Sequence, residues 1–164
     1  MPIVESAVPR IAVFADVQNI YYTCRHAYGR QFNYQALMDR VGNGGEIVAA
    51  TAYAIDRGDD QQRRFQSALR RIGFAVKLKP FIQRRDGTAK GDWDVGIAID
   101  VLDAAADIDV VVLLSGDGDF DLLLGKIRGD YGVRAEVYGV PDLTSNALID
   151  AASLYHRIDE TLLL

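Results

Sequence analysis

Five apolar runs of strand length alternate along the chain with segments of helical periodicity, and this alternation restricts the fold more than any other feature. The predicted strands are residues 10–16, 46–56, 74–81, 109–116 and 134–140. The intervening segments space apolar side chains three or four residues apart, which predicts helices over residues 19–28, 34–41, 60–72, 92–105, 120–131 and 145–155. We therefore predict a three-layer α/β/α fold whose central sheet is mostly parallel and has about five strands.

The size and composition of the chain fit one domain. Its 164 residues are 49% hydrophobic, which is enough to build a single core. We expect residues 1–9, with two prolines, to form a flexible arm and residues 10–164 to form the domain. No apolar run approaches the ~20 residues that span a bilayer, and Cys24 is the only cysteine. We therefore expect a cytoplasmic protein with no membrane segment and no internal disulfide.

Acidic side chains gather where predicted strands end. Asp16 ends the first strand, and Asp117 and Asp119 follow the fourth. Asp94 falls in the first turn of the helix that precedes the fourth strand. Ligands of open parallel sheets bind outside the carboxyl ends of the strands. A single aspartate at such a position is as often a helix cap as a metal ligand. Several carboxylates at one edge, however, repel one another unless protons or cations separate them, which favours a metal site.

The residue types at this edge indicate which metal to expect. Carboxylate oxygens with no histidine or cysteine nearby suit hard ions, so we predict Mg²⁺ or Mn²⁺ rather than zinc. In the stretch SGDGDF, Gly116 and Gly118 are expected to let the backbone turn sharply and approach a ligand closely.

Other sites built from the same residues are excluded by their details. The aspartates from Asp117 onward resemble the start of a calcium loop, but Leu122 and Arg128 stand where such a loop needs glycine and glutamate. The glycines of this turn begin a dinucleotide pattern, but Asp121 replaces the third glycine. The GxxxxGK[ST] sequence of phosphate-binding loops is absent.

Charge is divided unevenly along the chain. The net charge is −5, but residues 57–90 contain ten Lys or Arg and three acids, giving +7. The rest contains eight bases and twenty acids, giving −12. A solvated helix face is the simpler explanation of such a basic run, and a polyanion held beside bound cations is the functional one.

Three motifs in order, FADVQNI, KGDWDVGIAID and SGDGDF, resemble the NYN domain in its LabA-like bacterial branch, within the PIN-like nuclease superfamily. The family pattern begins with an aspartate and, three residues later, an asparagine, which Asp16 and Asn19 match. The family pattern continues with Lys-Gly and later aspartates, matched by Lys90, Gly91, Asp94 and Asp100. It then has Ser-Gly-Asp-x-Asp-Phe, matched by residues 115–120. A late Ser-x-x-Leu is matched by Ser145 and Leu148. The resemblance covers nearly the whole chain after the first nine residues.

The chain departs from the family pattern at two places. One residue more than usual separates Lys90 from the acid that follows, so either Asp92 or Asp94 is the family acid. The continuation to Asp100 favours Asp94. Ser153 stands where the family usually has an aspartate, which affects a peripheral contact and not the central acids.

The resemblance implies a metal-dependent ribonuclease whose products carry 5′-phosphate and 3′-hydroxyl ends. Its catalytic residues would be Asp16, Asp94, Asp117 and Asp119, and the first three would hold one or two ions. The supporting residues would be Asn19, Ser115, Asp100 and Ser145. Asp100 is six residues beyond Asp94, about 120° around a helix, which favours a supporting or structural role.

The basic stretch is then predicted to bind RNA, which is the expected partner in single-stranded or structured form. The residues predicted to hold the phosphate backbone are Arg84, Arg85 and Lys90, with Arg63 and Arg64 behind them. The candidates to stack unpaired bases are Tyr53, Phe81 and Trp93, with core packing as their alternative. A homodimer and a regulatory protein partner are left open.

Two other functions remain as alternatives. One is a module of the same fold that binds RNA without cutting it. The other is a phosphoacceptor or phosphatase domain, which also places aspartates at strand ends. The second fits less well, because Asp16 is followed by Val17 rather than by another acid and residues 134–140 contain no lysine.

Overall fold

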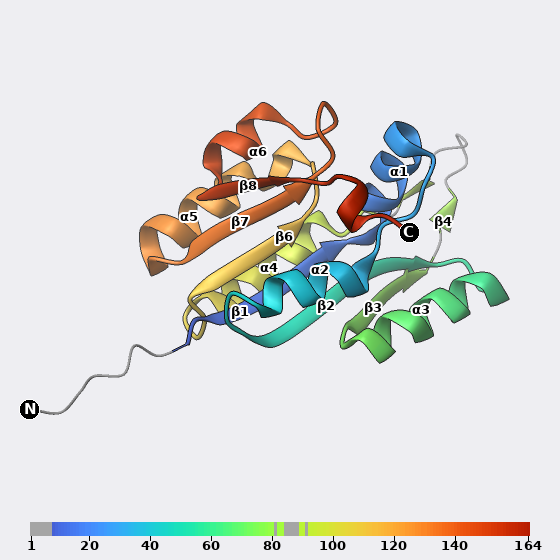
Figure 1. Ribbon diagram of the computed structural model, residues 1–164, viewed down its shortest axis with the longest axis horizontal. Helices are drawn as coiled ribbons and strands as arrows, with labels where there is room; N and C mark the ends of the chain where they lie inside the picture. Colours follow the sequence, from blue (N-terminus) through green and yellow to red (C-terminus); the bar gives the residue numbers. More distant parts are fainter. Residues whose placement is uncertain (1–7, 81, 84–88, 91) are drawn as a thin grey trace, which may run out of the picture.

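Six parallel strands form the central sheet of the computed structural model, which describes residues 8–80, 82–83, 89–90 and 92–164 (Figure 1). The strands are β1 (Arg10–Asp16), β2 (Glu46–Asp56), β3 (Ala75–Pro80), β6 (Val110–Leu114), β7 (Arg134–Gly139) and β8 (Leu154–Arg157), in the order β3-β2-β1-β6-β7-β8. A separate antiparallel pair joins β4 (Ile82–Gln83) to β5 (Ala89–Lys90). The predicted α/β class is confirmed, and the main sheet is parallel throughout.

Helices cover both faces of the sheet in the described part of the chain. One face packs against α1 (Val17–Tyr28), α2 (Tyr34–Gly42), α3 (Asp60–Ile72) and the short 3-10 helix η2 (Glu160–Leu162). The other packs against α4 (Asp94–Ala105), α5 (Asp121–Tyr131), α6 (Asn146–Ala151) and the 3-10 helix η1 (Gly118–Phe120). Figure 1 views the sheet with α2 in front and α4 behind.

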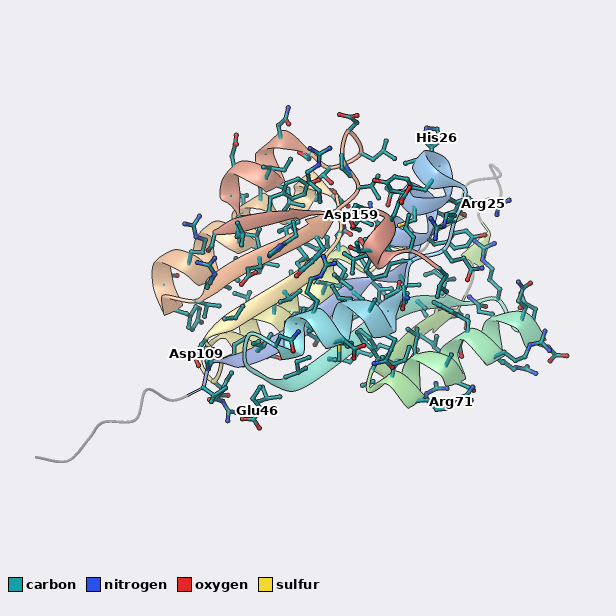
Figure 2. The ribbon with its side chains drawn as sticks, in the orientation of Figure 1. Arg25, His26, Glu46, Arg71, Asp109 and Asp159 are labelled. Carbon is teal, nitrogen blue, oxygen red and sulfur yellow. The ribbon has the colours of Figure 1, made fainter. Side chains whose placement is uncertain are left out.

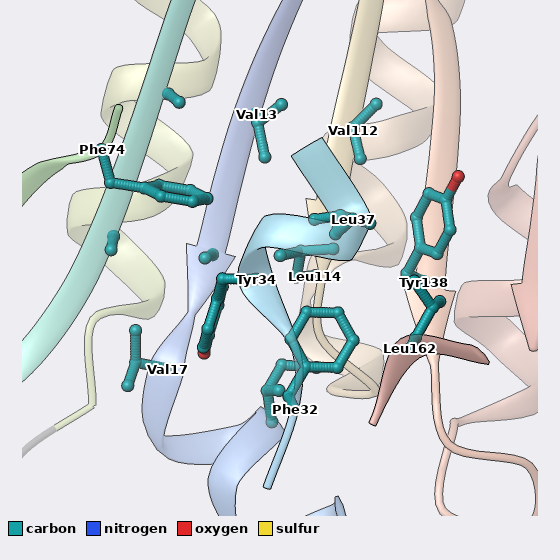
Figure 3. Packing of buried hydrophobic residues seen from close by; sticks show 14 of the residues in the cluster. Val13, Val17, Phe32, Tyr34, Leu37, Phe74, Val112, Leu114, Tyr138 and Leu162 are labelled. Carbon is teal, nitrogen blue, oxygen red and sulfur yellow. The ribbon is translucent and has the colours of Figure 1, made fainter. Parts of the chain in front are cut away.

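The two central strands are buried on both faces, which explains their unbroken apolar sequences. Successive side chains of a strand point to opposite faces, so Val112 and Leu114 of β6 join the core beneath α2. Val111 and Leu113 join the core beneath α4 and α5. Figure 3 shows Val112 and Leu114 packed beside Leu37 of α2.

Polar residues fix where several helices begin and end. The side chain of Asn33 accepts a hydrogen bond from the Ala36 backbone at 3.0 Å and caps α2. Asp59 caps α3 in the same way, accepting from Gln62 N at 2.7 Å. Gly29 ends α1 with φ of 63°, a left-handed conformation that favours glycine.

The end of the chain corrects one prediction. The helix expected over residues 145–155 ends at Ala151, and Leu154–Arg157 forms a sixth strand beside β7. Ser153 makes the transition, because its backbone N–H donates to Ala135 O at 2.7 Å and its Oγ accepts from Ala135 N at 2.9 Å. These bonds draw the chain into the sheet after one and a half turns of helix.

The N-terminal arm was predicted over residues 1–9, and residues 1–7 lie outside the described part of the chain. The two described residues of this arm, Val8 and Pro9, are exposed. Among the helices that the structure describes, none combines the length and the apolar character needed to cross a membrane.

Candidate metal centre

Three carboxylates from separate segments meet at the carboxyl edge of the sheet. Asp16 is the last residue of β1, Asp117 follows β6, and Asp94 is the first residue of α4. Strands β1 and β6 are parallel neighbours, so the segments that leave them emerge side by side. One carboxylate oxygen from each of the three aspartates lies within 4.8 Å of the others. Opposite oxygens around a Mg²⁺ ion are about 4 Å apart, so the group has the size and ligand type for a hard divalent ion.

Ser115 connects two of the three aspartates. Asp16 is only 8% exposed, and its Oδ2 accepts a hydrogen bond of 3.0 Å from Ser115 Oγ. The same hydroxyl oxygen accepts from Asp117 N at 3.1 Å. Asn19, in the first turn of α1, accepts from Gly116 N at 2.9 Å. The predicted supporting residues Ser115 and Asn19 therefore fix the turn after β6 against the end of β1.

The glycines of this turn make room for a neighbouring segment. A Cβ atom at Gly116 would lie 2.5 Å from Leu143 O, and one at Gly118 would lie 2.6 Å from Ser145 Oγ. Ser145 N donates to Gly116 O at 3.0 Å, which ties the segment before α6 to the turn. Of the described glycines, neither Gly116 nor Gly118 has a positive φ. Close packing explains both positions.

Trp93 anchors the start of α4, which carries Asp94. Its Nε1–H donates to Ala54 O of β2 at 2.9 Å. Lys79 of β3 places its Nζ 4.5 Å from the centroid of the Trp93 ring and donates to Asp92 O at 3.1 Å. The helix that carries Asp94 is thereby attached to two strands just before its first residue.

Asp100, six residues after Asp94, attaches the same helix to the sheet. Its Oδ2 accepts hydrogen bonds from Tyr53 Oη at 2.7 Å and from Lys77 Nζ at 2.6 Å. These partners lie on β2 and β3, and Asp100 is not one of the three carboxylates in the cluster. The geometry gives Asp100 a structural position.

Burial makes the ionised form of this cluster costly. Desolvation raises the pKa of the Asp16 carboxyl from 3.8 to about 6, and the charge of Asp117 adds to the rise. The hydrogen bond from Ser115 opposes that rise. Desolvation, followed by the charge and hydrogen bond of Asp117, raises the pKa of Asp94 to about 7. A divalent cation would relieve both effects, because it replaces lost hydration and cancels the repulsion.

Comparison with known proteins identifies the family. The family model of the NYN domain matches residues 10–159. The chain belongs to the NYN domain family. It is 30% identical over 127 residues to the "Low amplitude and bright protein LabA" of Synechococcus elongatus, covering 73% of this chain and 68% of that protein. A protein of unknown function from Vibrio parahaemolyticus has a crystal structure with a TM-score of 0.92 and 51% identity to this chain, covering 98% of this chain and 99% of that one.

Membership of the NYN family confirms the family that the three motifs indicated. NYN domains are PIN-like and generally comprise ribonucleases, so RNA is the family's characteristic substrate or partner. The acidic cluster of this NYN domain has the ligand type and spacing that suit a divalent metal.

The structure also locates the other acids predicted for the NYN site. Asp92 is exposed and outside the three-carboxylate cluster, and its Oδ1 accepts from Asp94 N at 3.2 Å. Of the two acids left open by the spacing, Asp94 is the one that the fold places in the cluster. Asp119 is also exposed, and its backbone N–H donates to Asp117 Oδ1 at 2.9 Å. Its predicted catalytic role remains a prediction.

The predicted RNA-binding residues are spread over several segments of the NYN domain. Arg63 and Arg64 are exposed on α3, and Arg63 forms an ion pair of 3.4 Å with Asp60. Lys90 belongs to β5, while Arg84 and Arg85 lie outside the described residues.

The aromatic candidates divide in a similar way. Tyr53 is 1% exposed and part of the core, so it presents no face for a base, and this stacking prediction is replaced by its packing alternative. Trp93 is half-buried, and its ring packs at a tilt against the ring of Tyr53, with the two centroids 5.3 Å apart. Phe81 lies outside the described residues.

Lys77 and Lys79 were missed as residues that serve the site. Both lysines lie on β3 with one residue between them, and residues two apart on a strand point to the same face. That spacing is visible in the sequence AVKLKP and indicates a shared side. Sequence alone does not say that α4 covers that side.

Proposed function

We propose that this NYN domain is a metal-dependent ribonuclease that hydrolyses RNA phosphodiester bonds at the Asp16–Asp94–Asp117 cluster with Mg²⁺ or Mn²⁺. The observation that carries the proposal is the convergence of three partly buried carboxylates, with one oxygen of each within 4.8 Å of the others, at the carboxyl edge of the sheet. Such a group is unfavourable without a cation, and its oxygen-only chemistry suits the two ions named.

Each residue of the site has a distinct task in this proposal. Asp16, Asp94 and Asp117 supply the carboxylate oxygens that hold the ion. A bound divalent ion lowers the pKa of a water molecule and neutralises charge on the scissile phosphate. Ser115 keeps the Asp16 carboxylate in place through its 3.0 Å hydrogen bond. We assign the exposed Asp119, whose backbone N–H donates to Asp117 Oδ1, to contact with solvent or substrate at the rim of the cluster.

The positive residues assigned to RNA lie in the stretch 57–90, which carries +7. We assign Arg84, Arg85 and Lys90 to the phosphate backbone, with Arg63 and Arg64 at a greater distance along the same chain segment. Lys79 joins this set, because its ammonium group lies over Trp93 and touches Asp92 O next to Asp94. Binding through these cations is expected to weaken as salt rises.

The test is cleavage of end-labelled single-stranded RNA by the purified protein with Mn²⁺, Mg²⁺ or EDTA. Asp16→Asn and Asp117→Asn preserve side-chain shape and remove one charge each. Asp103→Asn is the matched control, because Asp103 is an exposed aspartate on the same helix as Asp94. We expect metal-dependent cutting in the wild type and in the control, and its loss in both cluster variants. The products should carry 5′-phosphate and 3′-hydroxyl ends.

If the wild type binds RNA but does not cut it with either Mn²⁺ or Mg²⁺, the catalytic proposal is refuted. Salt-sensitive RNA binding that persists under those conditions would instead identify a non-catalytic RNA-binding module. Labelling of the protein by acetyl phosphate would point to the phosphoacceptor alternative.

A further inference from the structure

The outer side of α1 carries exposed aromatic rings. Tyr21 is 44% exposed and Tyr22 is 52% exposed, while Ile20 and Cys24 on the inner side of the same helix are fully buried. Exposing two neighbouring rings gives up the burial that would stabilise the fold. The inner side of α1 already supplies what the core needs, so the two tyrosines are free to serve a ligand.

This helix continues directly from the acid cluster. α1 begins at the residue after Asp16, and Asn19 in its first turn accepts a hydrogen bond of 2.9 Å from Gly116 N. Residues three apart are neighbours on a helix surface, so Tyr22 lies beside Asn19 on the next turn. At 1.5 Å per residue, Tyr22 is about 9 Å along the axis from Asp16. A polymer that leaves the cluster along α1 would therefore meet Tyr22 about 9 Å from Asp16.

The rings are arranged so that at least one face remains open. Tyr21 and Tyr22 form an edge-to-face pair with centroids 5.5 Å apart and an interplanar angle of 77°. In such a pair one ring contributes only its edge, and both of its faces stay free of the other ring. Arg25 steadies the pair, because its Nη1 donates to Tyr21 Oη at 2.7 Å and its guanidinium carbon lies 5.9 Å from the ring centroid.

The charge of α1 favours a polyanion. The sequence of the helix, VQNIYYTCRHAY, contains no acidic residue, whereas the whole chain has a net charge of −5. Its last turn carries Arg25 and His26, which Figure 2 shows at the outer end of the helix. Exposed aromatic faces beside a guanidinium are the features on which unpaired bases stack while phosphates are held.

We propose that Tyr21, Tyr22, Arg25 and His26 form a stacking surface that binds unpaired nucleotides of single-stranded RNA next to the acid cluster. The bases stack on the tyrosine rings, and the phosphates lie near Arg25. The proposal rests on the proposed function, because it names the form of RNA that the site accepts. Bases in a duplex keep their faces covered by neighbouring pairs, so this surface selects single strands.

The direct test measures binding separately from cutting. The full chain is titrated in EDTA with a single-stranded RNA that contains 2-aminopurine, whose fluorescence changes when the base stacks on an aromatic ring. The variants are Tyr21→Ala and Tyr22→Ala, with Tyr22→Phe as the conservative change. Tyr131→Ala is the matched control, because Tyr131 is also 44% exposed but lies at the far end of α5.

We expect each alanine variant on α1 to weaken binding of the single strand about tenfold and to reduce the fluorescence change. Tyr22→Phe keeps the ring and should bind as the wild type does, as should Tyr131→Ala. A blunt duplex of the same sequence should bind weakly and equally to all variants. Thermal melting of each variant checks that the exposed substitutions leave the fold intact.

Three results would overturn the stacking surface. One is single-strand affinity in the Tyr21→Ala and Tyr22→Ala variants equal to that of the wild type. Another is a loss of affinity in these variants that is equal for duplex and single-stranded RNA. The third is a change in sedimentation mass on substitution without a change in RNA affinity, which would assign the rings to contact with a second copy of the chain.

Failure of the stacking surface is distinguishable from failure of the nuclease proposal. If metal-dependent cutting is lost in Asp117→Asn but unaffected in Tyr22→Ala at limiting RNA, the nuclease stands and the stacking surface is wrong. If the wild type does not bind RNA either in EDTA or with Mn²⁺, and does not cut it, both proposals are wrong.

Discussion

Replacing Asp16 with asparagine should stabilise the metal-free protein at neutral pH while disabling the metal site. Asp16 is 8% exposed, and its carboxyl group is ionised at neutral pH only against the cost of desolvation and the repulsion of Asp117. Asparagine has nearly the same shape and offers an oxygen to the Ser115 hydroxyl. The substitution therefore removes the charge and keeps the packing.

The magnitude follows from the pKa of Asp16, which rises from 3.8 to about 6 on folding. Between those values the native state binds more protons than the unfolded state, so the free energy of unfolding falls as pH rises through this window. The full cost approaches about 3 kcal/mol above pH 7 and is about 1 kcal/mol at pH 4.5. The stability of Asp16→Asn relative to wild type should therefore improve by about 2 kcal/mol between pH 4.5 and pH 7.5.

The assay is urea unfolding followed by circular dichroism, with EDTA present, at both pH values. Using the change between two pH values cancels any constant effect of the new amide on the hydrogen bond with Ser115. Asp103→Asn is again the control, and its difference from wild type should be the same at both pH values. A difference between Asp16→Asn and wild type that does not change with pH would show that the Asp16 carboxylate is not costly, and the electrostatic reasoning for a cation site would fail.

Two further predictions follow from the same geometry. Mn²⁺ should raise the melting temperature of the wild type more at pH 7.5 than at pH 5. The reason is that protons compete with the ion for the carboxylates of Asp16 and Asp94, whose pKa values are raised to about 6 and about 7. Equal shifts in melting temperature at both pH values, or an undiminished shift in Asp117→Asn, would contradict this prediction. Gly116→Ala should lower the free energy of unfolding by about 1–3 kcal/mol, because its Cβ would lie 2.5 Å from the backbone oxygen of Leu143. Urea unfolding measures this, with Gly125→Ala as the control: nothing lies within 4 Å of its Cβ in the middle of α5, so that change should stabilise by about 0.5–1 kcal/mol.

The strands predicted from sequence are those with long apolar runs, and the strand of the main sheet that was missed, β8, lacks such a run. β8 has four residues, Leu154–Arg157, too few for alternation to distinguish a strand from the end of a helix. What makes it a strand is its pairing with β7, starting with the bond from Ser153 N to Ala135 O. Such a contact joins residues far apart in sequence, so no local pattern reveals it.

The candidate site was predictable wherever an acid follows a strand, and less so where a helix carries it. Asp16 and Asp117 are fixed by β1 and β6, whose ends are adjacent in any sheet that pairs them. The position of Asp94 depends on how α4 is docked, through Trp93 on Ala54 and Asp100 on Tyr53. For that reason the spacing of the motif left Asp92 and Asp94 as alternatives until the docking of the helix was known.

The same docking explains why Tyr53 does not stack on bases. On β2, Ala52 and Ala54 face the core beneath α2, while Tyr53 faces α4 and donates to Asp100. A strand buried on both sides hides a large aromatic even near its carboxyl end. Sequence could not separate this from an exposed position, because aromatic residues at strand ends occur in both settings.

The proposed roles of the acid cluster and of α1 together imply that metal and RNA bind cooperatively. Without a cation, the carboxylates of Asp16, Asp94 and Asp117 repel a phosphate, and the net charge of −5 gives no general attraction to RNA. With the cluster neutralised, a phosphate is able to approach it while neighbouring bases stack on Tyr21 and Tyr22. RNA affinity should therefore rise with divalent ion in the wild type, and by linkage RNA should tighten ion binding by the same factor.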